Sequence, residues 1–211
     1  MSTRFVFLAS KSPRRSELLR QIGVAHEVVV ADADVGAGAA TDAVDETPRV
    51  GETPDAYVIR LARSKAEAGW AHLTRGHAAK NAPPHPVLAA DTTVAIGERI
   101  LGKPESDADA RAMMAALSGR THHVYTAIAV ASPAGIRTAL SRSAVTMRAI
   151  TSEEIERYVA IGESADKAGA YAIQGHAAMF VERIEGSYSG VMGLPLLETA
   201  NLLSEAGLVL P

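Results

Sequence analysis

The chain has 211 residues, of which 47% are hydrophobic and 21% charged, so it holds enough apolar material for one sizeable core. Its 21 lysines and arginines against 24 aspartates and glutamates give a net charge of -3, which argues against a protein that coats a polyanion. The absence of cysteine excludes disulfides, thiolate metal sites and cysteine nucleophiles. The N-terminal residues lack the apolar stretch of a signal peptide, and no apolar run is long enough to span a bilayer. We therefore expect a cytoplasmic protein with no membrane partner.

Strands and helices alternate irregularly along the predicted chain. Strands are expected where apolar residues form short or alternating runs, which are residues 5–9, 27–30, 87–90, 121–131, 136–147 and 179–184. Helices are expected where apolar residues recur at helical spacing, which are residues 14–22, a helix opening at 53–55, residues 107–117, a helix after Thr151, and residues 195–206. Loops are expected at residues 31–43, 76–86 and 162–175, and a hairpin turn at 96–100. This order predicts an α/β fold, a mixed sheet with flanking helices and one dominant core.

Helix-capping patterns support two of these helices. Ser12 can cap the first helix, Pro13 suits its first position and Gly23 suits the residue after its end. Thr151 and Glu154 have the spacing of a capping box ahead of a later helix.

Two arginines, Arg14 and Arg15, stand in the first turn of a helix that directly follows a buried strand. Free backbone N–H groups and the helix dipole already favour an anion there, and two guanidinium groups strengthen that preference. The sequence therefore favours a phosphate-binding turn. The alternative is that both arginines belong to a solvated helix face.

Four further charged residues are candidates for the same chemistry. Lys65 lies on the apolar face of its helix, where an ammonium is costly unless an anion meets it, although its stem can also extend past the edge of the core. Asp91 ends the predicted strand at 87–90, a usual place for a metal ligand or general base, or for a carboxylate that caps the next turn. Lys103 is a cation on a stiff loop, and Glu46 is a second candidate carboxylate in an acidic loop.

Covalent nucleophiles and paired histidine ligands have no signature in this sequence. His122 and His123 are adjacent in a predicted strand, so their side chains point to opposite faces. No HExxH, Walker A or GxSxG motif is present. Several cations with a few carboxylates are instead what a metal-assisted attack of water on a polyphosphate requires.

Six ordered segments together resemble the Maf family of nucleoside triphosphate pyrophosphatases, and they cover nearly the whole chain. They are LASKSPRRSELL at 8–19, YVIRLARSKA at 57–66, AADTTV at 89–94 with GKP at 102–104, LSGRTHHVYT at 117–126, DKAGAYAIQG at 166–175, and GSY at 186–188 with VMGLP at 191–195. The segments at 31–43 and 76–86 are longer than family members typically need.

The resemblance implies a single domain over residues 1–211, with two lobes around a central cleft and a fold similar to inosine triphosphate pyrophosphatase. It also implies hydrolysis between the α- and β-phosphates, assisted by a divalent cation, Mg²⁺ or Mn²⁺. Carried over by position, Asp91 is the metal-linked carboxylate that acts as base, with Glu46 as its acidic partner and second metal ligand. Arg15, Lys65 and Lys103 hold the triphosphate.

Substrate recognition is also implied by position. Ser10 offers a hydroxyl or loop amide to the nucleotide, and Arg14, Thr92 and Gln174 resemble specificity-determining positions. The segments around Gln174 and at 186–188 resemble the branch that acts on dTTP and UTP. A carboxamide suits this assignment, because Gln174 can donate and accept at once toward a uracil or thymine edge.

Two other interpretations stay open at this point. One is the same enzyme with a preference for 7-methyl-GTP. The other is a nucleic-acid-binding or cell-division regulatory protein, in which Arg14, Arg15 and Arg20 would contact a phosphate backbone. A DNA-binding surface has no use for Asp91 beside two lysines, so nucleic acid is the less favoured partner. The resemblance implies a homodimer.

Overall fold

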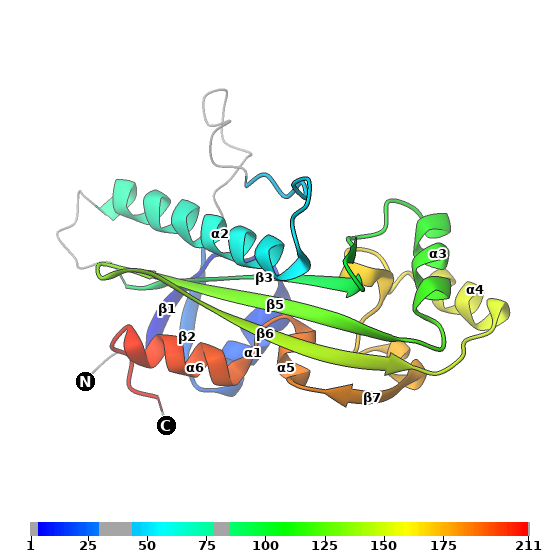
Figure 1. Cartoon of the computed structure of the whole chain (residues 1–211). Helices are drawn as coiled ribbons and strands as arrows, with labels where there is room; N and C mark the ends of the chain where they lie inside the picture. Colours follow the sequence, from blue (N-terminus) through cyan, green and yellow to red (C-terminus); the bar gives the residue numbers. More distant parts are fainter. Residues whose placement is uncertain (1–3, 30–43, 78–84, 211) are drawn as a thin grey trace.

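A computed structural model describes residues 4–29, 44–77 and 85–210, and Figure 1 shows their arrangement. A seven-stranded mixed sheet forms the centre, with strand order β2-β1-β3-β5-β6-β7 and β4 paired beside β3. The strands are β1 (Phe5–Leu8), β2 (Ala25–Val28), β3 (Val87–Ile96), β4 (Arg99–Leu101), β5 (Thr121–Ser132), β6 (Gly135–Met147) and β7 (Val181–Glu185). Strand β1 runs parallel to β2 and β3, and the other pairs are antiparallel. The predicted α/β class with a mixed sheet is confirmed.

Helices flank this sheet on both faces. They are α1 (Pro13–Gln21), α2 (Pro54–His77), α3 (Asp107–Leu117), α4 (Ser152–Ala160), α5 (Tyr188–Met192) and α6 (Leu196–Glu205), with two 3₁₀ turns at Ala168–Ala170 and His176–Phe180. Helix α2 covers one face, α1 and α6 cover the other, and α3 and α4 pack together at the far end of the long strands (Figure 1). None of the helices in the described ranges is long and apolar enough to cross a membrane.

Strand β3 carries side chains to both faces of the sheet, and this alternation sorts the core. Ala89 and Ala95 pack with α2 on one face, whereas Leu88 and Ala90 pack on the face that α1 and α6 cover. A third apolar cluster lies at the far end, under α3 and α4. These clusters meet beside β3, which therefore lies between the two halves of the molecule.

The prediction that a strand ends at Asp91 is wrong, because β3 continues through this residue to Ile96. Residues 92–95 pair with β5, and residues 94–96 pair with β4, so the ladder continues past the charge. On the other side, β1 pairs with β3 only as far as Leu88. Residues 89–93 thus have no strand beside them on that side within the described part of the chain. Asp91 therefore lies in the part of β3 between the residues paired with β1 and those paired with β4, where one edge of the strand is open.

Most remaining differences from the predicted elements are small shifts. The strand expected at 27–30 is β2 at Ala25–Val28, and the strand expected at 179–184 is β7 at Val181–Glu185, because the preceding residues form a 3₁₀ turn. Helix α2 runs to His77, one residue past the start of the loop expected at 76–86. The turn between β7 and α6 contains the short helix α5, which was not predicted. The loop expected at 31–43, and residues 78–84 of the later loop, lie outside the described residues.

The two predicted caps have different outcomes. Thr151 Oγ1 accepts a hydrogen bond from the amide of Glu154, whose side chain accepts one from the amide of Thr151, so the capping box is confirmed. Ser12 occupies the N-cap position of α1, but its side chain makes no capping hydrogen bond. Its neighbour Ser10 instead accepts a hydrogen bond from the Ser12 amide at 3.2 Å.

The capping box of α4 should contribute measurably to stability. Replacing Thr151 by Ala leaves the first-turn amides without their side-chain acceptor, and we expect a loss of about 1 kcal/mol in the free energy of unfolding. Urea denaturation followed by circular dichroism measures the change. Ser152→Ala removes the next hydroxyl, which is not at the N-cap, and should change stability by less than about 0.5 kcal/mol. Equal losses for both variants would contradict this prediction.

Candidate active site

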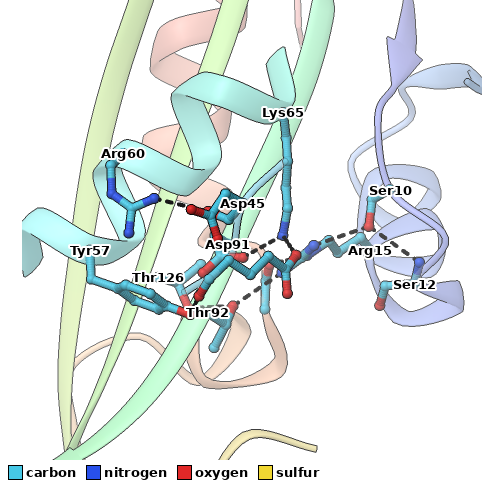
Figure 2. A network of polar contacts seen from close by, with 12 residues as sticks. Ser10, Ser12, Arg15, Asp45, Tyr57, Arg60, Lys65, Asp91, Thr92 and Thr126 are labelled. Atoms are coloured by element: carbon cyan, nitrogen blue, oxygen red, sulfur yellow. Dashed lines mark hydrogen bonds and ion pairs between the residues drawn. The ribbon is translucent and has the colours of Figure 1, made fainter. Parts of the chain in front are cut away.

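One ammonium group joins two carboxylates at the open edge of β3. Lys65 Nζ lies 2.7 Å from Asp91 Oδ1 (Figure 2). The same nitrogen lies 2.6 Å from Glu46 Oε1. Helix α2 presents Lys65 to the same face of the sheet as Asp91, and the segment before α2 brings Glu46 to them. The sequence left open whether Lys65 meets an anion or extends past the edge of the core, and in the structure its ammonium contacts two carboxylates.

The two carboxyl groups respond to this shared cation in opposite ways. Burial raises the pKa of Asp91 above its ordinary value, and the attraction of Lys65 does not offset it, because the side chain is only 11% exposed. Burial also acts on Glu46, but this side chain is 53% exposed, and its hydrogen bond and ion pair with Lys65 bring its pKa below the ordinary value. Neighbouring carboxyl groups with opposite pKa shifts are suited to different roles in acid–base chemistry.

Arg15 is held by three neutral acceptors from distant parts of the chain. It donates from Nη1 to Ser10 Oγ at 3.0 Å and from Nη2 to Thr92 Oγ1 at 3.3 Å (Figure 2). It also donates from Nε to the carbonyl of Gly193 at 2.8 Å. Gly193 follows α5 with a φ of 115°, a left-handed conformation that favours glycine. Burial lowers the pKa of Arg15, although Asp91 opposes the shift. No carboxylate within the described ranges directly contacts this guanidinium, so its charge remains available to an anion.

A chain of hydroxyl groups continues from Arg15 through the sheet. Thr126 donates from Oγ1 to the carbonyl of Gly190 at 2.7 Å, so its oxygen accepts the hydrogen of Thr92, 2.9 Å away. The lone pairs of Thr92 then face Arg15. Each hydroxyl hydrogen has one acceptor, so the chain fixes the orientation of the guanidinium.

Arg14 differs from Arg15 because one of its donors is unused. Its Nε is buried and has no hydrogen-bond partner among the described residues. Burial also lowers the pKa of Arg14. A buried donor without a partner is costly, and an incoming acceptor would relieve that cost. The first turn of α1 therefore presents the fixed guanidinium of Arg15 and the guanidinium of Arg14, whose Nε donor has no acceptor among the described residues.

These groups line a cleft of about 1100 Å³ that passes through the gap beside β3. Lys103 and Gln174 also line it, and their side chains are exposed. The cleft brings together all nine residues predicted for the site, which are Ser10, Arg14, Arg15, Glu46, Lys65, Asp91, Thr92, Lys103 and Gln174. Six lysines and arginines and three carboxylates line it, so the cleft is positive in a chain with a net charge of -3. Such a site attracts a polyanion.

The segment that carries Gln174 is held by Glu163. This carboxylate accepts hydrogen bonds from the amide and ring of His176, at 3.0 and 2.9 Å, and from the hydroxyl of Tyr158 at 3.2 Å. A Cβ at Gly175 would overlap the Glu163 carboxylate, so only glycine allows this approach. Burial raises the pKa of Glu163, but its hydrogen bonds with His176 outweigh that effect and lower it.

A divalent cation fits the donor set of this cleft only together with a substrate. The described residues contain no group of three or more histidine, cysteine, aspartate or glutamate side chains that could hold a metal. Asp91 and Glu46 supply two carboxylates, and Mg²⁺ is usually held by one or two carboxylates with substrate phosphates and water. The residues present therefore fit a metal that binds with the nucleotide.

The adjacent histidines lie on opposite faces of β5, as predicted. His122 is buried, its Nε2 lies 2.8 Å from the hydroxyl of Tyr171, and burial lowers its pKa to about 4. His123 contacts Arg142 on the other side. These two side chains cannot form a joint metal site. Both are outside the lining of the cleft.

Comparison with known proteins agrees with this geometry. The model of the family described as Maf-like protein matches residues 5–206. The chain belongs to the Maf family. The dTTP/UTP pyrophosphatase of Cupriavidus metallidurans is 56% identical over 206 residues, which is 98% of both chains. That of Methylobacillus flagellatus is 52% identical over 98% of this chain and 94% of its own. The Ham1 protein of Staphylococcus aureus aligns over 95% of this chain and 96% of its own, with 15% identity and a TM-score of 0.47.

Several residues of the Maf site were missed by the sequence analysis. Thr126 and Lys167 border the groups described above, and Lys167 lines the cleft, where burial and Arg14 lower its pKa. Arg60 and Glu52 form an ion pair beside the segment that carries Glu46. No residue type or spacing marked these four in the sequence as members of a site, and their contacts emerge only from the fold.

Burial of Asp91 predicts that its charge destabilises the folded protein. Its pKa is raised in the folded state, so the penalty is full above that raised pKa, shrinks as the pH falls through it, and disappears below the ordinary value of 3.8, where the folded and unfolded chains are both protonated. Asp91→Asn should therefore raise the free energy of unfolding at pH 7.5 by more than about 0.5 kcal/mol. Urea denaturation of both proteins at pH 7.5, 5.5 and 4.5 should show the gain shrinking.

Asp55→Asn is the matched control, because hydrogen bonds at the start of α2 lower the pKa of Asp55. Its removal should have the opposite sign and reduce stability at pH 7.5. An Asp91→Asn protein that is less stable than the wild type at pH 7.5 would show that the ion pair outweighs the burial cost.

Proposed function

We propose that this chain hydrolyses dTTP and UTP to the nucleoside monophosphate and pyrophosphate. The observation that carries the proposal is the contact between Lys65, Glu46 and Asp91 in a positively lined cleft, together with a half-buried Arg15 that contacts no carboxylate of the described residues. This combination suits attack of water on a polyphosphate, which requires cations for the charge and a carboxylate for the proton. The names of the curated relatives support the same reaction and the pyrimidine substrates.

In this mechanism each side chain has one task. Arg15, Lys103 and the unused donor of Arg14 bind phosphate oxygens, and Ser10 adds a hydroxyl at the same turn. Asp91 accepts a proton from the attacking water, because its raised pKa makes it a stronger base than an exposed aspartate. Lys65 holds the carboxylate in position for that transfer. Pyrophosphate then leaves with its charge balanced by the surrounding cations.

Asp91 and Glu46 are the residues that would hold the divalent cation. When bound, such a cation neutralises phosphate charge and lowers the pKa of a coordinated water. Either Mg²⁺ or Mn²⁺ suits oxygen ligands of this kind.

Base recognition is assigned to the rim of the cleft that carries Gln174, with Arg14 and Thr92 as the other specificity-determining positions. The Gln174 carboxamide offers one donor and one acceptor, which match the adjacent carbonyl and N–H of uracil or thymine. We also propose that the chain forms a homodimer in the cytoplasm, and that residues 1–211 act as one domain with the cleft between its two lobes.

A nucleotide panel tests the reaction. Wild-type protein with Mg²⁺ or Mn²⁺ should release pyrophosphate from dTTP and UTP faster than from GTP or 7-methyl-GTP, with no orthophosphate. Asp91→Asn should retain less than a tenth of wild-type kcat, a loss of more than about 1.4 kcal/mol in transition-state stabilisation. Release of orthophosphate, or a preference for 7-methyl-GTP, would contradict the proposal.

Gln174→Glu tests the base assignment. The change replaces an amide donor by a second acceptor, so kcat/KM for dTTP and UTP should fall by the equivalent of roughly 1–3 kcal/mol. Turnover of GTP should fall much less, because a purine would not use the same pair of groups. Gln21→Glu makes the same change at an exposed position of α1 and should leave the ratio of dTTP to GTP unaltered. Equal losses for both nucleotides would show that Gln174 does not read the base.

A further inference from the structure

The segment that presents Glu46 has no regular secondary structure, yet its backbone is held at three consecutive residues. The carbonyl oxygens of Asp45, Glu46 and Thr47 each accept a hydrogen bond from a side chain of α2. Arg60 donates to the first at 3.0 Å and to the third at 3.1 Å, and Tyr57 donates to the second at 2.8 Å. Arg60 and Tyr57, from the first two turns of α2, therefore hold the backbone of Glu46 and of the residues before and after it.

The guanidinium of Arg60 is itself fixed. Its Nε lies 2.6 Å from Glu52 Oε1, and its Nη2 lies 2.7 Å from Glu52 Oε2, which is a two-pronged ion pair. The side chains of Arg60 and Glu52 are only 16% and 9% exposed. Glu52 also accepts the amide hydrogen of Arg49 at 3.0 Å. The ion pair is thus largely shielded from water and tied to the same segment that it holds.

The remaining contacts of the segment agree with a fixed conformation. The Asp45 carboxylate accepts the amide hydrogen of Thr47 at 2.9 Å. Burial, and the charges of Asp91 and Glu46, raise the pKa of Tyr57 to about 12, so its hydroxyl keeps its hydrogen for the Glu46 carbonyl at any physiological pH. Figure 2 shows Tyr57 and Arg60 beside Asp45, with Lys65 and Asp91 next to them.

We propose that Arg60, with Glu52 and Tyr57, positions Glu46 for catalysis by holding the backbone at residues 45–47. This role rests on the proposed function, since it concerns the carboxylate that joins Lys65 and Asp91. Arg60 acts through Glu46 and is a positioning residue, not a group that touches the substrate. Lysine cannot replace it, because only a guanidinium can donate to two carbonyls and both carboxylate oxygens from one planar group.

Kinetics of Arg60→Lys test the proposal. The variant keeps the charge and the helix propensity but loses the planar guanidinium that donates to Glu52 and to the two carbonyls. We therefore expect kcat/KM for dTTP to fall at least tenfold. The Mg²⁺ concentration that gives half-maximal activity should rise, because Glu46 is a proposed ligand. Arg63→Lys is the matched control on the same helix, since Arg63 makes an exposed i,i+4 pair with Glu67. It should stay within twofold of the wild type.

A double-mutant cycle separates positioning from general damage to the fold. Glu46→Gln removes the group through which Arg60 acts. Adding Arg60→Lys to the Glu46→Gln protein should therefore lower kcat/KM for dTTP by less than a further threefold. Tyr57→Phe, which removes one hydroxyl and no charge, should show a smaller loss that also disappears in the Glu46→Gln background. If Arg60→Lys costs tenfold in both backgrounds, or behaves like Arg63→Lys, the proposal is wrong.

Hydrogen exchange without nucleotide gives a readout that does not depend on activity. The amides of Thr47 and Arg49, which donate to the carboxylates of Asp45 and Glu52, should exchange at least tenfold faster in Arg60→Lys than in the wild type, while those of α3 stay unchanged. Unchanged exchange at these two amides overturns the positioning role whatever the activity. If wild-type protein hydrolyses no nucleotide, the proposed function fails, and the exchange rates still decide whether Arg60 holds this segment.

Discussion

The ammonium of Lys65 between the carboxylates of Glu46 and Asp91 is the contact on which the rest of the site depends. The two carboxylates repel each other, and without the ammonium between them each would be harder to ionise. The three groups come from α2, from β3 and from the segment before α2. Their contact therefore requires that helix, strand and segment keep one relative position, and the packing of α2 on the sheet supplies it.

The gap beside β3 explains why this contact faces a cleft and is not sealed inside the core. Strand β1 pairs with β3 only as far as Leu88, and β4 pairs with β3 only from Val94 onward. The edge of β3 between these two residues is therefore open. Helix α1 starts beside this opening and directs Arg15 into it. Each of the hydrogen bonds of Arg15 goes to a neutral oxygen, which holds the guanidinium without neutralising it. An anion that enters the gap thus meets a cation that is already oriented.

The order of apolar patterns predicted the fold class, and local context indicated three charged residues of the cleft. Arg15 stands in the first turn of a helix, where an anion is favoured, and Lys65 lies on an apolar helix face, where a charge is costly unless it has a partner. The prediction placed Asp91 at the end of a strand, because a carboxylate within a buried strand requires a cation beside it. That cation is Lys65 on α2, which lies 26 residues earlier in the sequence. Arg60 and Thr126 were not found, because each depends in part on backbone carbonyls, which carry no residue type. The carbonyl that orients Thr126 is 64 residues distant.

The two carboxylates reach the same ammonium by different means, and their exposure explains the difference. Asp91 is built into the central strand, where pairing with Ala127 of β5 fixes its backbone, and burial protects its ion pair. Glu46 is more than half exposed, and an exposed ion pair contributes only about 0–1 kcal/mol, too little to hold an irregular segment in one conformation. The segment therefore requires hydrogen bonds that do not depend on the Glu46 side chain. Arg60 and Tyr57 supply them through the backbone, which leaves the carboxylate of Glu46 free for the chemistry of the cleft.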